Sequence, residues 1–237
     1  MDANEGYCEN ITIMLESLLV YERDFFLWLN GCHTLFFDNF FWMYSGKVAW
    51  VPLALVILFC LVYKENRKES AFVLLFLILT ILLCDQFASH ICKPLFARFR
   101  PTHHPDFMNE VKTVFGYRGG RYGFISSHAA NAFGFATYLS FLLRNKWLAL
   151  SFFLWALINS YSRIYLGVHF ISDIVPGAIS GLFFGWLCYH LYLKVHYRLL
   201  PQFPVISYGE KRINGIIIAF LLTHLMLILV SAYKTIF

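Results

Sequence analysis

The sequence predicts an all-α fold, a polytopic bundle of membrane-spanning helices. Hydrophobic residues make up 59% of the 237 residues and charged residues only 14%, against about 45–50% and about 25% in an average soluble chain. The mean hydropathy is +0.61. The apolar residues also gather into six runs, each near the roughly 20 residues that cross a bilayer. These observations exclude a disordered chain, a coiled coil and an ordinary soluble domain.

Residues 1–46 precede these runs and differ from them, because acidic residues stand there among many aromatic ones. The stretch FFDNFFWMYS is too short and too polar to span a bilayer, and aromatic rings settle at the headgroup level. We therefore predict an N-terminal interfacial helical segment over residues 1–46, with a soluble cap over the bundle as the alternative. The acidic start MDANEGYCEN lacks the basic region of a cleaved signal peptide.

Residues 47–237 form the second predicted unit, a single domain of six transmembrane helices. No repeat and no Pro/Ser-rich linker divides it. The predicted spans are 48–63, 71–90, 128–143, 147–164, 171–195 and 214–232. Cys60, Cys84 and Cys188 lie inside these runs and the chain has no CxxC motif. We therefore expect its cysteines to pack as small hydrophobic residues rather than bind a metal or form disulfides.

Six spans would place alternate connections on opposite sides of the membrane. One side carries basic residues close to helix ends, which are Lys64, Arg67, Lys68, Arg144, Lys146, Lys194, Arg198, Lys211 and Arg212. On the other side the basic residues are spread over a long tail and a long loop. The positive-inside rule then places the first side in the cytoplasm and the second outside. The net charge of +5 does not indicate nucleic-acid binding, because no basic stripe is present.

The outward side collects polar residues in the connections 91–128 and 162–173. The first reads ICKPLFARFRPTHHPDFMNEVKTVFGYRGGRYGFISSH and the second SRIYLGVHFISD. A cluster of lysine and arginine binds a multiply charged oxyanion, and arginine does so with two hydrogen bonds. Ser126 and Ser127 stand where a helix begins, so they are candidate caps whose backbone N–H groups face the same anion.

His169 and Asp173 are four residues apart, which would place them on one helix face if the segment is helical. A histidine can attack phosphorus and form a covalent phosphoenzyme. A carboxylate on its other ring nitrogen fixes the tautomer and stabilises the charge, and a second histidine can protonate the leaving oxygen. The pattern therefore predicts phosphoryl transfer that needs neither a metal nor another cofactor.

These residues resemble the type 2 phosphatidic acid phosphatase (PAP2) superfamily, which has the blocks K-x6-R-P, P-S-G-H and S-R-x5-H-x3-D. KPLFARFRP keeps the first block and SRIYLGVHFISD the third. The second is ISSH, in which Ile125 replaces the proline and Ser127 the glycine. LNGCHTLFFDNFFW and CDQFASH further resemble PAP2 proteins of Bacteroidetes-type bacteria.

The resemblance implies a metal-independent lipid phosphatase in the bacterial inner membrane, with its site facing the periplasm. His169 would be the nucleophile, Asp173 its orienting partner and His128 the general acid and then base. The implied phosphate-binding residues are Lys93, Arg100, Ser126, Ser127 and Arg163. The implied partners are the lipid bilayer and a lipid phosphate, with undecaprenyl pyrophosphate ranked before lipid A and phosphatidylglycerol phosphate or phosphatidic acid. The oligomeric state stays open.

Other polar residues have two interpretations each. Arg98, Arg118 and Arg121 either hold a second phosphate or a lipid headgroup, or are solvated loop charges. Asp85, in the second apolar run, either takes part in function or pairs structurally with His90 or a motif cation. His103 and His104 are adjacent, so they point in different directions and predict loop residues rather than a metal pair.

Gly177, Gly181 and Gly185 form GxxxG steps in the fifth run. Close packing within the chain is favoured over dimerisation.

A transporter or channel also carries charges within the membrane, but it places them at the midplane between repeats, whereas these polar residues lie at helix ends. The soluble vanadate-dependent haloperoxidases share the motif, and the six apolar runs exclude them.

Overall fold

The computed structural model of the chain describes residues 16–237, so residues 1–15 of the predicted interfacial segment, including Cys8, lie outside the described part. Between residues 16 and 237 every regular element is a helix, and the β interactions come down to one isolated bridge between Phe99 and Tyr122. The all-α prediction is confirmed.

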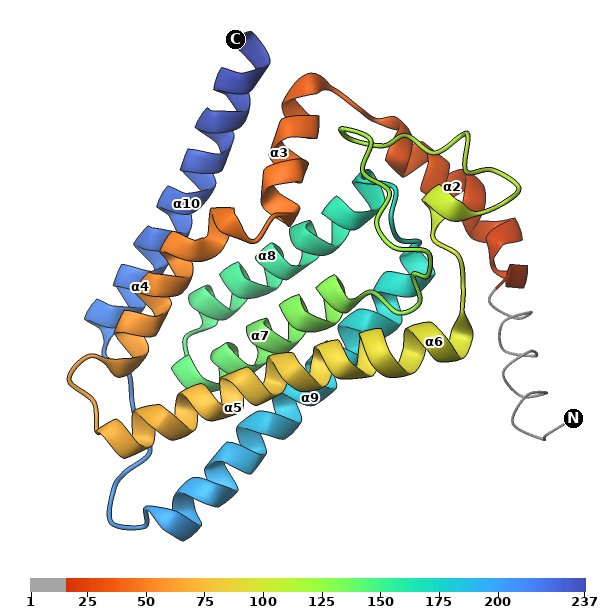
Figure 1. Cartoon of the computed structure of the whole chain (residues 1–237). Helices are drawn as coiled ribbons and strands as arrows, with labels where there is room; N and C mark the ends of the chain where they lie inside the picture. The colour runs from red at the N-terminus through yellow and green to blue at the C-terminus, as the bar shows by residue number, and fades with distance from the viewer. Residues whose placement is uncertain (1–15) are drawn as a thin grey trace, which may run out of the picture.

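The helices follow one another from the N-terminal segment to the C-terminus (Figure 1). Their bounds are α2 Leu19–Gly31, α3 Leu35–Ser45, α4 Val51–Val62, α5 Arg67–Gln86, α6 Lys93–Phe96, α7 Ser127–Leu143, α8 Lys146–Tyr165, α9 Ile171–Leu199 and α10 Glu210–Ile236, with 3₁₀ turns at Val48–Trp50 and Pro101–His103. A π-helical turn, Phe87–Cys92, joins α5 to α6 in one 30-residue helix. Each predicted run is therefore helical.

Within residues 16–237, three helices are long and apolar enough to cross a membrane, namely Arg67–Phe96, Ile171–Leu199 and Glu210–Ile236. Helix α3 and the segment Val48–Val62 would make a fourth span if taken together, although they are bent by 71°. Helix α7 is shorter, with 17 residues. The chain is thus a helical membrane bundle with three or four candidate spans among residues 16–237, and the count of six remains a prediction.

Helix α7 lies in the middle of the bundle, where it packs on α5, α8 and α9 (Figure 1). Glycines set its distance from α9. A Cβ atom on Gly181 would lie 2.3 Å from the Ala130 carbonyl oxygen, and one on Gly185 would lie 2.6 Å from that of Gly134. The glycine steps therefore serve packing within the chain, as predicted.

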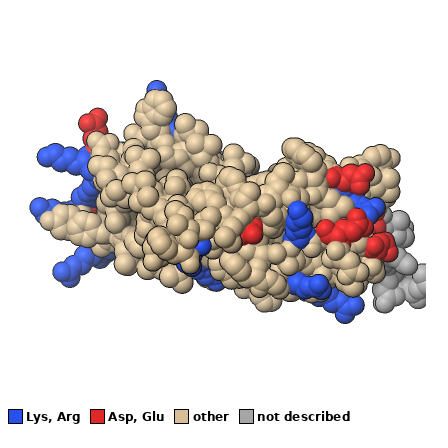
Figure 2. All heavy atoms as spheres, turned by 90° about the horizontal axis from the view of Figure 1, so that it is seen from above, with Lys and Arg blue, Asp and Glu red and all other residues tan. Residues whose placement is uncertain are grey.

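The surface of the bundle is largely apolar between its two ends. Figure 2 shows mainly Lys and Arg at one end and both acidic and basic side chains at the other, with mostly uncharged residues between them. Helix α10 exposes a row of large apolar side chains, Ile218, Leu221, Leu222, Leu225 and Leu229. A continuous exposed apolar surface of this kind is typical of contact with lipid.

Of the cysteines, Cys60, Cys84, Cys92 and Cys188 are buried free thiols, as predicted.

A buried polar cluster joins the start of α5 to the end of α9. The Glu69 carboxylate lies 2.6 Å from Nδ1 of His196 and accepts a hydrogen bond from the Tyr192 hydroxyl. The other ring nitrogen of His196 lies 3.1 Å from the Phe203 carbonyl oxygen. Both ring nitrogens of His196 therefore face oxygen atoms, one of Glu69 and one of the loop after α9. The cluster fastens the loop after α9 to the bundle.

The N-terminal helices are fastened to the opposite end. The Asn30 side chain donates to the carbonyl oxygens of Ile164 and Tyr165 and accepts from the Lys112 N–H at 2.8 Å. Phe26 packs edge-on against Phe170, at 5.2 Å between ring centroids. Helix α2 therefore covers the end of α8 and the start of α9. Its placement at a membrane interface stays a prediction.

Candidate active site

The three sequence blocks meet at one end of the bundle. Lys93 lies at the end of the long helix that begins at Arg67, Ser126 and Ser127 begin α7, and Arg163 lies in the last turn of α8. His169 and Asp173 stand at the entry to α9. The loop between α6 and α7 brings Arg100 to the same place, because its guanidinium reaches the carbonyl oxygens of both Tyr122 and Val168.

His169 is buried, with 1% of its surface exposed. Its Nε2 lies 3.2 Å from a guanidinium nitrogen of Arg100 and its Nδ1 lies 3.3 Å from Oδ2 of Asp173. Because arginine only donates hydrogen bonds, Nε2 must accept this one. The proton of the neutral ring is then on Nδ1, facing the carboxylate. The lone pair on Nε2 therefore faces the guanidinium of Arg100.

The environment keeps this imidazole neutral. Burial, followed by the positive charges of Arg100, Arg163 and Lys93, lowers the pKa of His169 well below its usual value. Burial and the neighbouring Arg163 also lower the pKa of Arg100, yet a guanidinium keeps its proton in proteins. The site thus combines fixed positive charge with an unprotonated nitrogen, which are the two requirements for attack on a phosphate.

Asp173 is fully buried and holds its position through both carboxylate oxygens. Oδ2 accepts from the Phe170 N–H at 3.0 Å, and Oδ1 accepts from Arg98 at 3.0 Å. Gly123 covers the pair closely, since a Cβ atom there would lie 3.0 Å from Oδ2 of Asp173 and 3.1 Å from Cγ of Arg100. A side chain at this position would push the loop away from the site.

Ser127, which stands where the resembled family has glycine, binds Lys93. Its hydroxyl accepts a hydrogen bond from the Lys93 ammonium at 3.2 Å, and Ser89 accepts a second at 3.1 Å. Ser89 in turn donates to Asp85 at 3.3 Å. Asp85 therefore reaches a motif cation through Ser89, in line with the structural interpretation. Ser127 has right-handed helical backbone, so its conformation does not require glycine.

Ser126 links the second block to the third. Its hydroxyl accepts from the Ala129 N–H at 3.4 Å, which makes it the N-cap of α7 as predicted. Its own N–H, however, donates to the Asp173 carbonyl oxygen at 3.0 Å. The expectation that this N–H faces a phosphate is wrong, because it joins two helices instead. In a first helical turn the free N–H groups follow the cap, so here Ser127 and His128 supply them.

Arg163 and His128 line one pocket of about 290 Å³. Arg163 donates to the Ser45 hydroxyl and, at 3.3 Å, to the Tyr117 hydroxyl. The pocket wall also includes Trp42, Gly46, Lys47 and Leu166. Sequence reasoning missed Trp42, Ser45, Lys47 and Tyr117, because they come from outside the three blocks and no spacing connects them to those blocks. The aromatic residues around the bend after α3 were the available signal.

The remaining polar candidates lie apart from the His–Asp pair or serve other contacts. His104 pairs with Glu16 at 3.2 Å, and Arg121 lies over the rings of Phe99 and Tyr122. Arg118 is exposed. Among residues 16–237 no group of three or more His, Cys, Asp or Glu side chains is placed to hold a metal ion. Arg98 is buried, so it is not a solvated loop charge.

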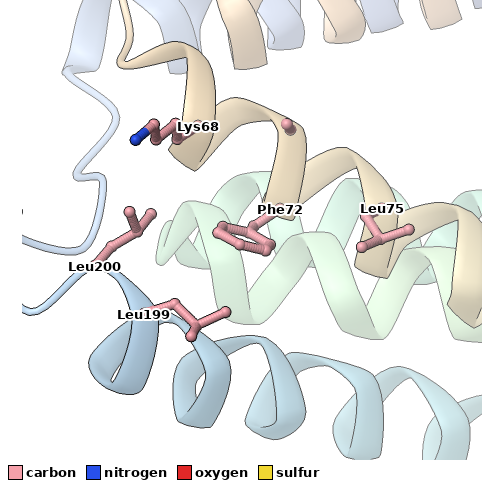
Figure 3. Close-up of a pocket in the computed structure, with 6 residues that line it drawn as sticks. Lys68, Phe72, Leu75, Leu199 and Leu200 are labelled. Carbon is pink, nitrogen blue, oxygen red and sulfur yellow. The ribbon is translucent and has the colours of Figure 1, made fainter.

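A second hollow, at the opposite end of the bundle, lacks this chemistry. It measures about 370 Å³ and lies between the start of α5 and the end of α9, with Lys68, Phe72, Leu75, Leu199 and Leu200 around it (Figure 3). Apart from Lys68 its labelled side chains are apolar. The pocket beside Arg163 and His128 is the candidate active site, because these residues belong to the third and second sequence blocks.

The geometry fits the family that the sequence resembles, and the family comparison agrees. The model of the PAP2 superfamily matches residues 71–197. The chain belongs to the PAP2 superfamily. The match runs from α5 through most of α9, and so contains every predicted catalytic and phosphate-binding residue.

Curated PAP2 relatives cover most of the chain. A lipid A 4'-phosphatase of Porphyromonas gingivalis is 46% identical over 204 residues, which are 84% of this chain and 86% of the relative. A lipid A 4'-phosphatase of Bacteroides thetaiotaomicron is 39% identical over 225 residues, 94% of this chain and 100% of the relative. An undecaprenyl-diphosphatase of Sulfolobus acidocaldarius is 26% identical over 147 residues, 61% of this chain and 64% of the relative.

Solved structures share the fold. Aquifex aeolicus LpxE gives a TM-score of 0.50 at 24% identity, covering 71% of this chain and 94% of that one. A transmembrane PAP2-type phosphatidylglycerolphosphate phosphatase from Bacillus subtilis gives 0.55 at 17% identity, covering 80% and 96%. The chain is a PAP2-type lipid phosphatase of a bacterial membrane. Its relatives do not favour the ranking that placed undecaprenyl pyrophosphate first among substrates.

Proposed function

We propose that this PAP2 phosphatase removes the 4'-phosphate from lipid A. The observation that carries the proposal is the pair of relatives with this activity, at 46% and 39% identity over 84% and 94% of the chain. The relative that acts on undecaprenyl diphosphate matches a shorter part at 26% identity. Lipid A therefore replaces undecaprenyl pyrophosphate as the proposed substrate.

The proposed reaction passes through a phosphohistidine on His169. Nε2 forms a bond to phosphorus while the bond from phosphorus to the sugar oxygen breaks, and His128 gives that oxygen a proton. Water then attacks the phosphohistidine, His128 takes the proton from this water, and inorganic phosphate leaves. Asp173 stabilises the positive charge that develops on the imidazole.

The cations hold the non-bridging oxygens in this proposal. Arg100 already lies 3.2 Å from Nε2 of His169, and Arg163 opens into the pocket that His128 lines. The Lys93 ammonium donates hydrogen bonds to the hydroxyl of Ser89 and to that of Ser127, which begins α7. Three positive charges beside helix-terminal N–H groups are suited to the charge that spreads over a phosphoryl group during transfer.

The pocket mouth supports a sugar phosphate over a simple prenyl or glycerol phosphate. Trp42 and Tyr117 meet edge to face there, with 5.6 Å between ring centroids, and Trp42 is 39% exposed. Lys47 adds an exposed cation beside them. An accessible aromatic wall with a charge at its edge provides both an apolar face and polar contacts for a sugar ring next to the phosphate.

The test is a panel of lipid phosphates given to detergent-purified protein in the presence of EDTA. Lipid A bisphosphate, undecaprenyl pyrophosphate, phosphatidylglycerol phosphate and phosphatidic acid are compared by kcat/KM for phosphate release. We expect lipid A to be preferred, and mass spectrometry of the product to show loss of the 4'-phosphate with the 1-phosphate kept. Preference for undecaprenyl pyrophosphate, or loss of the 1-phosphate, would contradict the proposal.

A variant of the mouth makes the same test sharper. Trp42→Ala removes the aromatic wall without touching His169, so KM for lipid A should rise severalfold while kcat/KM for phosphatidic acid stays near that of the wild type. Trp147→Ala is the control, because Trp147 is an exposed tryptophan at the start of α8, outside the pocket. An equal effect of Trp42→Ala on both lipids would remove the support for a sugar contact.

A further inference from the structure

Arg98 stands two residues before Arg100 but serves a different purpose. Only 1% of its surface is exposed. One guanidinium nitrogen lies 3.0 Å from Oδ1 of Asp173 and 2.5 Å from the Ser172 hydroxyl, and the other lies 2.7 Å from Oε1 of Glu22. A guanidinium held between two carboxylates has its charge compensated. Arg98 is therefore unsuited to bind a second phosphate of the substrate.

Glu22 belongs to α2 and completes this arrangement. Its Oε1 also accepts from the Ser172 hydroxyl at 2.6 Å, and its Oε2 accepts from the Ser172 N–H at 3.1 Å. That N–H belongs to the first turn of α9, where a carboxylate is stabilised by the helix dipole. Glu22 therefore holds Arg98 and the start of α9 at once.

The contacts form one line from the N-terminal helix to the imidazole ring of His169. Glu22 holds Arg98, Arg98 holds Oδ1 of Asp173, and Oδ2 of Asp173 faces Nδ1 of His169. The Arg98 guanidinium also lies over the aromatic ring of Phe170, at 4.6 Å from the ring centroid. Arg98 holds Oδ1 and the Phe170 N–H holds Oδ2, so both contacts oppose rotation of the carboxylate and keep Oδ2 directed at His169.

We infer that Arg98 and Glu22 are positioning residues, through which helix α2 takes part in the active site. They fix the carboxylate that orients His169 and touch no phosphate themselves. The inference rests on the proposed roles of His169 and Asp173, although not on which lipid is the substrate. Loss of either residue lets the Asp173 carboxylate turn, so the imidazole is aimed less well and the chemical step slows.

The experiment compares Arg98→Met, Arg98→Lys, Glu22→Ala and Glu22→Gln. We expect Arg98→Met and Glu22→Ala to lower kcat by about tenfold to a hundredfold, as small misplacements of reacting groups do, with KM within about threefold of the wild type. Arg98→Lys and Glu22→Gln keep part of the hydrogen bonding and should recover part of kcat. The double variant Arg98→Met with Glu22→Ala should cost no more than the worse single variant, because both act on the same carboxylate.

Arg23 and Glu110 provide a matched control. They form an exposed ion pair at 2.6 Å that also joins α2 to the loop before α7, but the pair does not contact Asp173. Arg23→Met should leave kcat unchanged. An equal loss in Arg23→Met and Glu22→Ala would mean that α2 only needs to be attached, and would overturn the inference. So would unchanged kcat in Arg98→Met, or a loss confined to KM.

Two further choices separate this inference from the proposed function. All variants are assayed with whichever phosphate lipid of the panel the wild type hydrolyses fastest, so a failure of lipid A as substrate leaves the comparison intact. If Arg98→Met does not yield folded protein, the decision passes to Arg98→Lys and Glu22→Gln. Wild-type kcat in both of these variants would overturn the inference.

Discussion

Asp173 illustrates how single residues in this site are held by several partners at once. Its carboxylate accepts from Arg98 and from the Phe170 N–H, and it faces His169. Its backbone carbonyl oxygen accepts from the Ser126 N–H. One residue thus joins the third sequence block to the second and, through Arg98, to the first, so a change of its charge without a change of its size is informative.

Asp173→Asn keeps the size of the side chain and removes the charge. We expect kcat to fall on the order of a thousandfold or more, because the amide can favour the wrong imidazole tautomer and does not stabilise the developing cation. Asp106→Asn is the control, since Asp106 is an exposed carboxylate in the loop before α7. Near wild-type activity of Asp173→Asn would reduce this residue to a helix cap for the Phe170 N–H.

The protonation of His169 can be followed directly. Burial and nearby cations lower its pKa, so the neutral form, which exists above the pKa, should persist when the pH falls through the usual histidine value of about 6.5. Nitrogen NMR of ¹⁵N-histidine-labelled protein, with His169→Asn to assign the signal, should show a ring that stays neutral and protonated on Nδ1 as the pH falls through about 6.5, where an ordinary histidine takes up its second proton.

Added phosphate gives the control for this titration. A bound anion compensates the positive charges that lower the pKa of His169, so the pKa should move upward on binding. A His169 ring that titrates near pH 6.5 without an anion, or that carries its proton on Nε2, would contradict the tautomer assigned from the contact with Arg100.

Among the helices, the contact between α7 and α9 decides the shape of the site. A Cβ atom on Gly177 would lie 2.7 Å from the Ser126 carbonyl oxygen, next to the hydrogen bond between Ser126 and Asp173. The glycine steps of α9 therefore let the two motif-bearing helices approach each other at the level of the catalytic groups. A third helix also reaches this level. Its π-helical turn directly precedes Lys93 and so affects where the Lys93 side chain is placed.

Gly181→Ala tests this contact. The new methyl group would meet backbone atoms, the Ala130 carbonyl oxygen at 2.3 Å and the Gly134 nitrogen at 2.8 Å, so neither neighbour can rotate away. Overpacking of this kind costs about 1–3 kcal/mol, and we expect a lower melting temperature in detergent together with lower kcat, since α9 carries Asp173.

Gly215→Ala in α10 is the matched control. A Cβ atom there has no heavy atom within 4 Å, and alanine is the better helix former by about 1 kcal/mol. This variant should melt at or above the wild-type temperature with unchanged activity. If Gly181→Ala melted like Gly215→Ala, the glycines would not be needed for the approach of α7 and α9.

At the scale of the whole molecule, the two ends differ in charge and in chemistry. At one end the charged side chains are mainly Lys and Arg (Figure 2), while helix α2 and the start of α9, where the His–Asp pair stands, lie at the other (Figure 1). By the positive-inside rule the basic end belongs in the cytoplasm. We propose on this ground that the active site faces the periplasm from the inner membrane.

Single cysteines test this orientation. Lys68→Cys marks the basic end, and it keeps the Asn66 side chain that caps α5. Asp106→Cys marks the other end. After removal of the native cysteines, and with turnover retained, a membrane-impermeant thiol reagent should label residue 106 in intact cells and residue 68 only after lysis. The reverse pattern would place the site in the cytoplasm and would contradict a periplasmic substrate.

The spacing of the third block did bring His169 and Asp173 together, although not on one helix face, because His169 precedes Phe170, the N-cap of α9, and Asp173 lies in the first turn of that helix. His169 and Asp173, four residues apart, do face each other at 3.3 Å. The cap role of Ser126 also followed from residue type at a helix start. The contacts that Arg98 and Ser127 make could not be predicted from the sequence. Their partners lie far from them along the chain, and no sequence period connects the residues in contact.

By itself the sequence determined the helical class, the membrane setting, the family and the residues of the His–Asp pair, because hydropathy and short-range spacing act locally. Tertiary structure alone decided the rest. It made Arg98, which the sequence left as a candidate phosphate ligand, the ion-pair partner of Asp173. It also brought Glu22 and Ser45 of the N-terminal segment to the site. The physical reason is that burial forces each charge and polar group to find a partner, and which partner is near depends on how distant segments pack.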